Sequence, residues 1–498
     1  MNKLLISSLA AALCLPSAAM LHNLTWPWMN PPRCSGPQTP LFAFYNRANT
    51  TMLFDSGESI EIFCQAQVRC GTGLSWTLHH NMVDLPFAEG AGEDLPANLF
   101  RIVIPTGDLK PGFYDLRVRL EGLGFERLEL FAAEKSDPVG QCTFGWKVDE
   151  MPLPAPSYRP ADFRAFWDKA YGDYCRNVPL DARIESAEVT FDAKAVETFN
   201  VTNACLPPCF DPKGVRFDKV ISCKVSWAGP DGGRVYANLA RPAAPGRYPG
   251  MLVLPGAGTG PRTRPLDHAR HGYVAIDVQV HGLDTDTVPN TPIPGYNGTP
   301  MPGDDMRTES SAWYNIYLRA ARGVDYLCSL AFVDPTKIVT VGGSQGGRLS
   351  VVVPAIDRRV AATVPAIQHG SLETYLWWFR RQNGFARGYE DPRPDPAIVR
   401  TNGHGAYDSS CAEPADPVFL RYRYFDPLNF APDVTCPVMM NMGLTDPCSF
   451  AQGVYATYLR LGSSDRTIVP IAGHAHDWFA AFDRAAYRWL ADRLKLRE

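Results

Sequence analysis

Short segments in which hydrophobic and polar residues alternate fill the first part of the chain. Residues 59–68 and 113–120 are such segments, and in the second one leucine and valine alternate with two arginines. A period of two is typical of β-strands with one buried face, and glycine or proline residues lie between the segments. We therefore predict a small all-β, immunoglobulin-like sandwich over residues 20–137.

The pattern changes in the second half of the chain. From about residue 215 onwards, apolar strand-like runs such as 251–254 and 337–341 alternate with amphipathic helical segments such as 312–330. This alternation predicts an α/β fold, with a mainly parallel sheet covered by helices on both faces. We interpret the proline-rich segment 138–157 as a linker and residues 158–498 as a catalytic domain.

The N-terminus has the composition of a secretory signal peptide. Lys3 precedes an apolar run over residues 4–15, and Ser17-Ala-Ala19 offers small residues for cleavage. We therefore expect residues 1–19 to be removed and the protein to be secreted or periplasmic. No later segment has the length of a membrane span. With a formal net charge of −4 and no large basic block, nothing indicates a nucleic-acid partner, while a homo-oligomer stays open.

The cysteines point to an oxidising compartment. Thirteen occur, and twelve remain once Cys14 leaves with the signal peptide. An even number in a secreted chain favours disulfides, for example Cys64 with Cys70 across a hairpin, or Cys205 with Cys209 around a tight loop. A second pair with zinc-ribbon spacing does not occur, so we expect no metal.

One glycine-rich motif has a specific chemical interpretation. Gly342-Gly-Ser-Gln-Gly-Gly347 follows the apolar strand 338–341 and precedes a helical stretch, 348–353. This context matches the strand–turn–helix of a nucleophile elbow, which predicts Ser344 as a nucleophile. The turn has no room for side chains two positions to either side, and the N–H of Gln345 at the helix start would stabilise an oxyanion.

A serine hydroxyl needs a base, and the base needs an orienting acid. In this fold the acid and then the histidine follow the serine along the chain. Asp446 comes just after the predicted strand 437–442, and His474 comes just after the predicted strand 468–471. The carboxyl ends of parallel strands share one edge of the sheet, so we expect both residues beside Ser344.

Other residues compete for these two roles. His476 lies two positions after His474 and is the rival base, although we favour His474. Asp477 follows the histidine and would break the expected order, whereas Asp433 precedes its strand and lies at the wrong end of the sheet.

A second oxyanion donor is expected from the loop after an early strand. Leu254-Pro-Gly-Ala-Gly-Thr-Gly260 follows strand 251–254, and the N–H of Ala257 is our candidate. The loop also resembles a dinucleotide fingerprint with Asp277 at a suitable distance. That interpretation fails because Pro261 replaces the third glycine, so we expect no organic cofactor.

These motifs together resemble the acetyl xylan esterase and cephalosporin C deacetylase family of the α/β-hydrolase superfamily. The resemblance covers about two-thirds of the chain, and Gln345 after the serine is a rather specific mark of it. The segments that carry it are Pro160-Ala-Asp-Phe163 with Phe166-Trp167, Tyr314-Asn-Ile-Tyr317, Val333-Asp-Pro-Thr-Lys-Ile338, Gly342–Gly347, Tyr424-Phe-Asp-Pro-Leu-Asn429 with Cys436-Pro437, Gly443-Leu-Thr-Asp446, and Gly473-His474.

The resemblance implies a Ser344–Asp446–His474 triad, with backbone donors at Gln345 and Ala257. It also implies release of acetate from an acetylated oligosaccharide or polysaccharide, without metal or organic cofactor.

The chain departs from the family pattern in segments that we expect to border the pocket. A segment that often reads Asp-x-Arg-Gly-Gln-Gly is Asp277-Val-Gln-Val-His-Gly282, and residues 374–389 look like an enlarged insertion. We therefore expect the substrate-binding residues to include His281 from the first segment and two tryptophans from the second, together with Tyr314. The tryptophans are Trp377 and Trp378.

Two alternatives remain open. A prolyl-oligopeptidase-type peptidase would share the fold and the triad, but Gln345 and the absence of an evident propeller count against it. A glycan-binding protein with a decayed hydrolase domain would suit the N-terminal sandwich, but the serine, aspartate and histidine in the expected order count against it.

Overall fold

The computed structural model describes residues 42–66, 73–80, 88–121, 139–202, 214–289, 291, 312–372, 417–446, 448–476 and 479–496. Outside these residues lie the predicted signal peptide and six residues named above: Cys70, Cys205, Cys209, Trp377, Trp378 and Asp477.

The described residues of the N-terminal unit form eight strands, an all-β arrangement that the alternating pattern predicts. They are β1 (Phe42–Tyr45), β2 (Leu53–Phe54), β3 (Ile60–Ala66), β4 (Gly73–His80), β5 (Ala88–Leu95), β6 (Leu99–Ile104), β7 (Gly112–Glu121) and β8 (Val139–Trp146). Their order is β1-β3-β6-β5-β4-β7-β8-β2. The first part of β5 pairs with β4 and its last three residues pair with β6, so this strand joins two halves of the sheet.

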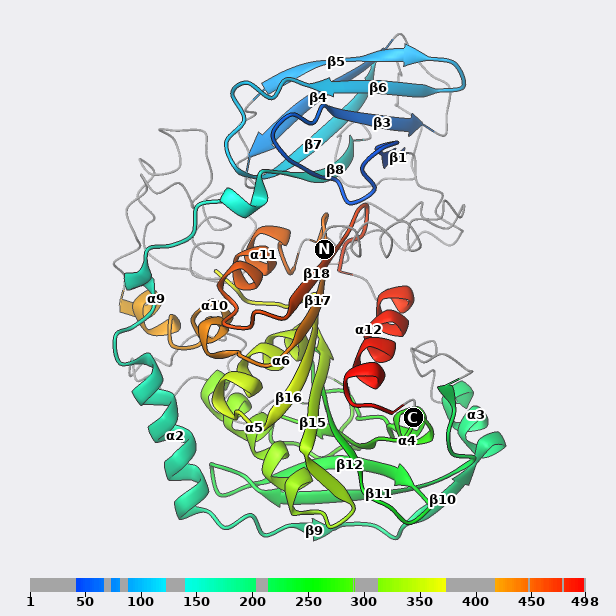
Figure 1. The fold of residues 1–498 in the computed structure, drawn as a ribbon, viewed down its shortest axis with the longest axis vertical. Coiled ribbons are helices and arrows are strands. Elements are labelled where there is room, and N and C mark those ends of the chain that lie inside the picture. The colour runs from blue at the N-terminus through cyan, green and yellow to red at the C-terminus, as the bar shows by residue number, and fades with distance from the viewer. Residues whose placement is uncertain are drawn as a thin grey trace.

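The two halves enclose one core (Figure 1). Cys64 on β3 and Cys142 on β8 are five places apart in strand order, yet their thiols interact. Burial raises the pKa of the Cys142 thiol well above its usual value, and the nearby Cys64 raises it further. A flat sheet would hold strands in these positions more than 20 Å apart, at roughly 4.8 Å per strand, so the sheet must curl.

The sheet extends into the segment predicted as a linker. β8 pairs with β7 over eight positions, from Gly112↔Trp146 to Arg119↔Val139. The boundary expected at residue 137 is therefore too early. Cys142, Phe144 and Trp146 alternate into the core, a strand pattern that the proline-rich composition further along the segment obscured.

In the part of the chain that the structure describes, the larger sheet has ten strands. They are β9 (Arg183–Ile184), β10 (Val189–Asp192), β11 (Lys219–Ala228), β12 (Arg234–Pro242), β13 (Tyr248–Leu254), β14 (Val274–Gln279), β15 (Val333–Gly343), β16 (Val360–Ala366), β17 (Val438–Gly443) and β18 (Arg466–Ile471). The order is β10-β11-β12-β14-β13-β15-β16-β17-β18, with β9 paired to β11. Strands from β14 to β18 are parallel, and β10, β11 and β12 add an antiparallel edge.

Helices cover both faces of this sheet, so the predicted α/β-hydrolase fold is confirmed (Figure 1). They are α2 (Phe163–Asn177), α3 (Ala193–Thr202), α4 (Leu266–Arg270), α5 (Ala312–Ser329), α6 (Gln345–Ile356), α9 (Pro417–Tyr422), α10 (Pro427–Phe430), α11 (Ala451–Arg460) and α12 (Ala480–Arg493). Adjacent residues of β13 face opposite sides of the sheet. Leu252 packs in the cluster containing α5 and α6, whereas Met251 packs in the cluster containing α12.

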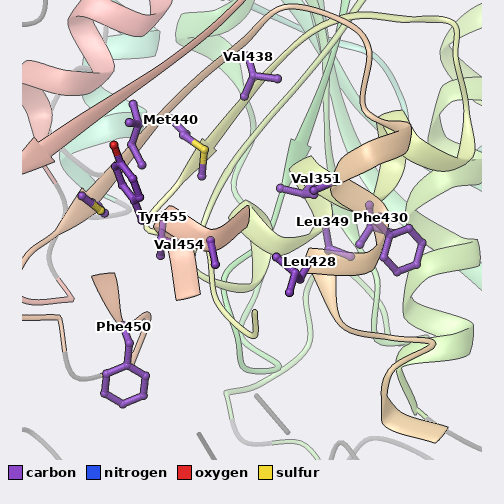
Figure 2. Packing of buried hydrophobic residues seen from close by; sticks show 14 of the residues in the cluster. Leu349, Val351, Leu428, Phe430, Val438, Met440, Phe450, Val454 and Tyr455 are labelled. Carbon is purple, nitrogen blue, oxygen red and sulfur yellow. The ribbon is translucent and has the colours of Figure 1, made fainter. Parts of the chain in front are cut away.

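Figure 2 shows the packing on the α6 side near β17. Leu349 of α6 and Leu428 of α10 meet Val438 and Met440 of β17 and Val454 of α11 in one buried cluster. This cluster fixes α6, which begins directly after Ser344.

Helix α11 also contacts the N-terminal sandwich. The Tyr455 hydroxyl donates a hydrogen bond to Asp149 at 2.7 Å, and the edge of its ring meets Phe113 of β7 at 5.9 Å between centroids. Helix α11 thus packs against both β17 and the N-terminal sandwich.

The expected disulfides are not found in the described part of the chain. Its seven cysteines are free thiols, and Cys64 is one of them, so the bridge to Cys70 is not formed. None of the described helices is long and apolar enough to cross a membrane.

Candidate active site

Ser344 occupies a sharp turn between β15 and α6. Its φ is 59° and its ψ is −117°, a backbone conformation that non-glycine residues rarely adopt. The Ser344 N–H donates to the Ala366 carbonyl at 3.0 Å, and the Ser344 carbonyl accepts from the Arg348 N–H at 2.9 Å. These bonds hold the strained residue between β16 and the first turn of α6.

The glycines around Ser344 are required by close backbone contacts, as the sequence predicts. A Cβ atom on Gly346 would lie 2.2 Å from the Leu254 carbonyl oxygen, and one on Gly342 would lie 2.7 Å from the Gly346 carbonyl carbon. Such distances are far inside van der Waals contact, so the elbow closes only without these side chains.

A hydrogen-bonded chain runs from Ser344 through His476 to Asp446. The His476 Nε2 atom lies 2.8 Å from the Ser344 Oγ atom, and its Nδ1 atom lies 2.8 Å from Asp446 Oδ2. Asp446 is buried, and its Oδ1 atom also accepts the backbone N–H groups of Cys448 and Ser449 at 2.8 Å each. Because the carboxylate only accepts, Nδ1 carries the proton and Nε2 is the acceptor for the serine hydroxyl.

The expectation that His474 lies in this chain is wrong. Its ring is buried edge-on against Phe479, with centroids 4.7 Å apart, and its carbonyl accepts from Thr445. The loop turns at Gly473, which has a φ of +69°, so that the chain reaches Ser344 two residues later than expected.

Of the two rival carboxylates, Asp433 does not replace Asp446, because it forms an ion pair with Arg159 at the far side of its strand. Asp477 lies outside the described residues.

The two predicted oxyanion segments are adjacent. Gln345 is the first residue of α6, and its side-chain amide donates to the Gly256 carbonyl at 3.4 Å. Ala257 follows Gly256 in an exposed part of the loop after β13. The elbow and this loop therefore border the same space above Ser344.

The side chains of His281 and Tyr314, two of the expected substrate contacts, make contacts within the protein. The His281 ring is 2 % exposed, and both its nitrogens lie against glutamine side chains, Gln279 and Gln345. Tyr314 packs on α2, with its ring stacked on Trp167 at 5.9 Å between centroids. The other two expected contacts, Trp377 and Trp378, lie outside the described residues.

A cavity of about 490 Å³ opens beside Ser344 and His476. One wall is a row of residues paired across the sheet on one face, and the other is α12 with Ala486 and Leu490. The row consists of Asp277, Val253, Val341 and Val364.

Two buried carboxyl groups line this cavity. Burial raises the pKa of Asp277 to about 6 and that of Asp483 to about 7. Asp483 is absent from the predicted site residues, although it occupies the apolar face of the last helix, three residues before Ala486 and seven before Leu490. Among the described residues no group of three or more histidines, cysteines or carboxylates is arranged to hold a metal ion.

A family model described as acetyl xylan esterase matches residues 200–493, more than half of the chain. The chain belongs to the acetyl xylan esterase family. It is therefore a carboxylic ester hydrolase.

Individual proteins that are similar to this esterase are acetyl esterases or acetyl xylan esterases by name. It is 26 % identical to the acetyl esterase Axe7A of Xylanibacter ruminicola over 386 residues, which cover 75 % of this chain and 73 % of the relative. Acetyl xylan esterases from Paenibacillus sp. R4 and Thermoanaerobacterium sp. JW/SL YS485 share its fold at 20 % identity and a TM-score of 0.51. They match over 69 % and 71 % of this chain, respectively, and over 98 % of their own lengths.

The buried Asp483 generates a prediction about the pH dependence of stability. Its carboxyl group is ionised above about pH 4 in the unfolded chain but only above about pH 7 in the fold, so stability declines as pH rises across that window. Asp483→Asn, which mimics the protonated acid, should be more stable than wild type at pH 8.5, by of the order of 2–4 kcal/mol, and similar to it at pH 4. Thermal unfolding at the two pH values measures the difference.

Asp492, an exposed carboxylate on the same helix, provides the matched control. Asp492→Asn should show no such pH-dependent gain. If Asp483→Asn destabilises the esterase equally at both pH values, the carboxyl group is not held in its neutral form.

Proposed function

We propose that Ser344, His476 and Asp446 form a catalytic triad that removes acetyl groups from O-acetylated carbohydrates through an acyl-enzyme. The observation that carries this proposal is the continuous hydrogen-bonded chain from Ser344 Oγ through His476 to Asp446. The names of the relatives, acetyl esterase and acetyl xylan esterase, support acetate as the acyl group.

In the first step His476 acts as the general base. Its Nε2 atom, 2.8 Å from the serine oxygen, takes the hydroxyl proton as Ser344 attacks the ester carbonyl. The imidazolium that forms is stabilised by Asp446, which accepts a hydrogen bond from the Nδ1–H group and keeps the ring in the productive tautomer.

The negative charge on the carbonyl oxygen needs preorganised donors. We assign these to the backbone N–H groups of Gln345 and Ala257. The Gln345 N–H lies at the N-terminus of α6, where the helix dipole favours negative charge. His476 then protonates the leaving alcohol, and water activated by the same histidine releases acetate from Ser344.

The cavity beside His476 is our candidate for the alcohol half of the ester. An acetyl group has only a few heavy atoms, each with a volume comparable to that of a methylene, so the cavity is on the order of ten times too large for it. The apolar wall and the buried carboxyl groups of the cavity suit a ring that carries hydroxyl groups. We further propose that the protein acts outside the cytoplasm, on the strength of the signal-like residues 1–19.

The two loop histidines give a matched test of the triad. His476→Ala should lower kcat for 4-nitrophenyl acetate by roughly 10⁴-fold, because the base is lost, whereas His474→Ala should retain kcat within about tenfold. Steady-state kinetics on both purified variants measure the contrast. The reverse order would restore His474 as the base and refute the assignment.

Acetate release from a panel of substrates tests the substrate class. We expect the wild type to deacetylate acetylated xylo-oligosaccharides with a higher kcat/KM than 4-nitrophenyl butyrate or an alanyl dipeptide amide. Ser344→Ala should lower turnover of every ester by several orders of magnitude. Near-wild-type activity in that variant would refute Ser344 as the nucleophile, and no activity on any acetylated sugar would refute the carbohydrate substrate.

A further inference from the structure

We propose that His281 is a positioning residue of the oxyanion hole, which it serves by linking Gln279 and Gln345 into a hydrogen-bonded bracket around the loop that carries Ala257. The inference rests on the proposed acyl-transfer function but assigns a role that the triad does not require. It explains a buried histidine that is 64 residues away from the elbow in sequence and in direct contact with it.

The bracket holds the loop at both of its ends. At one end the Gln345 side-chain amide donates to the Gly256 carbonyl at 3.4 Å. At the other end the Gln279 side-chain amide donates to the Gly260 carbonyl at 3.2 Å. His281 joins the two glutamines, with Nδ1 at 2.8 Å from Gln279 Oε1 and Nε2 at 3.1 Å from Gln345 Nε2.

One arrangement of protons satisfies these four bonds, and it selects the Gln345 amide nitrogen at 3.1 Å over the Gln345 Oε1 atom at 3.4 Å as the partner of His281 Nε2. Gln279 Oε1 only accepts, so the His281 Nδ1 atom must donate. In the neutral ring Nε2 is then an acceptor, and the Gln345 amide nitrogen is the donor that faces it. The same amide group supplies a second proton for the Gly256 carbonyl, so the orientation of Gln345 is fixed by both contacts.

The surroundings of His281 favour this neutral form. Burial lowers the pKa of His281 to about 4, and the nearby Arg262 and Arg319 guanidinium groups also disfavour a charged ring. Arg319 additionally donates to the Val280 carbonyl at 3.2 Å, which fixes the backbone directly before His281. The histidine is therefore a rigid, uncharged connector rather than a proton carrier.

The consequence concerns the distance between the two proposed oxyanion donors. The Gln345 N–H belongs to α6, whereas the Ala257 N–H belongs to an exposed loop that follows β13. These donors stabilise an oxyanion only if both lie at hydrogen-bonding distance from one point, and preorganisation is what makes them effective. The bracket sets the loop against the helix before substrate arrives.

Kinetics of His281→Leu test the role, because this change removes both hydrogen bonds at the ring. We expect kcat for 4-nitrophenyl acetate to fall by about 10- to 100-fold with KM within about threefold, as for partial loss of an oxyanion donor. The rate at which a fluorophosphonate labels Ser344 should fall in parallel. His281→Gln, whose amide can donate and accept, should recover at least part of the lost kcat.

Two further variants keep the test independent of folding. Gln279→Met removes the hydrogen bonds of Gln279 without changing Gln345, and it should lower kcat less than His281→Leu does. In the double variant the two effects on kcat should not be additive. His80→Leu is the matched control, since His80 is equally buried, at 2 % exposure, but lies in the sandwich on β4. That variant should keep kcat per folded molecule even if its melting temperature falls.

Several results would overturn the proposal. An unchanged kcat in His281→Leu, or a rise in KM alone, would make His281 a structural residue or a substrate contact. Additive effects of the Gln279 and His281 substitutions would mean that the two residues act independently, which would refute the bracket. Failure of the proposed function gives a different result, because Ser344→Ala would then retain activity. Without an acyl-enzyme at Ser344, the oxyanion role of His281 would be refuted as well.

Discussion

The strained turn at Ser344 depends on three parallel strands meeting in one register. A positive φ at a non-glycine residue costs on the order of 1–3 kcal/mol and persists only where the surroundings determine it. Leu254 of β13 pairs with Gly342 of β15, and Gly343 pairs with Ala366 of β16. These pairings bring the Leu254 carbonyl against Gly346 and the Ala366 carbonyl onto the Ser344 N–H. A slip of one residue in either pairing would remove the contact that this pairing provides, so the conformation of Ser344 is a product of the sheet register.

The helix that leaves this turn is held by an unusual buried cation. Arg348, one turn after Ser344, is fully buried with its guanidinium 3.7 Å from the centroid of the Trp313 ring. It donates to the Tyr422 hydroxyl and to the Phe425 carbonyl, both at 2.9 Å. Removing a partner from a buried charge is expensive, so the contacts that solvate Arg348 also fix α6 against α5 and the segment before α10. The direction of the Gln345 N–H follows from that of the helix.

The sequence predicted features that depend on neighbouring residues, such as the elbow. It did not predict features that depend on the path of a loop or on contacts between distant segments. The elbow around Ser344 was predictable because strand, turn and helix signals lie within sixteen residues. The choice between His474 and His476 was not, because it depends on how the chain turns at Gly473 and on Phe479 filling the space beside the first histidine. His281 was expected to touch substrate because it departs from the family pattern. Its real partners come from β14 itself and from an elbow 64 residues further along the chain, a pairing that periodicity does not encode.

Burial divides the polar groups near Ser344 into two kinds. Asp446 is surrounded by donors, with two backbone N–H groups and the His476 ring directed at its oxygens. Asp483 instead faces the apolar wall of the cavity, where burial raises the pKa of its carboxyl group, and burial lowers the pKa of the His281 imidazole. In the proposed acyl transfer, new charge develops on His476 and on the oxyanion, and a nearby charge in a low-dielectric region would perturb both strongly. Burial therefore reduces the charge that Asp483 and His281 place near Ser344, whereas the charge of Asp446 is stabilised by the donors around it.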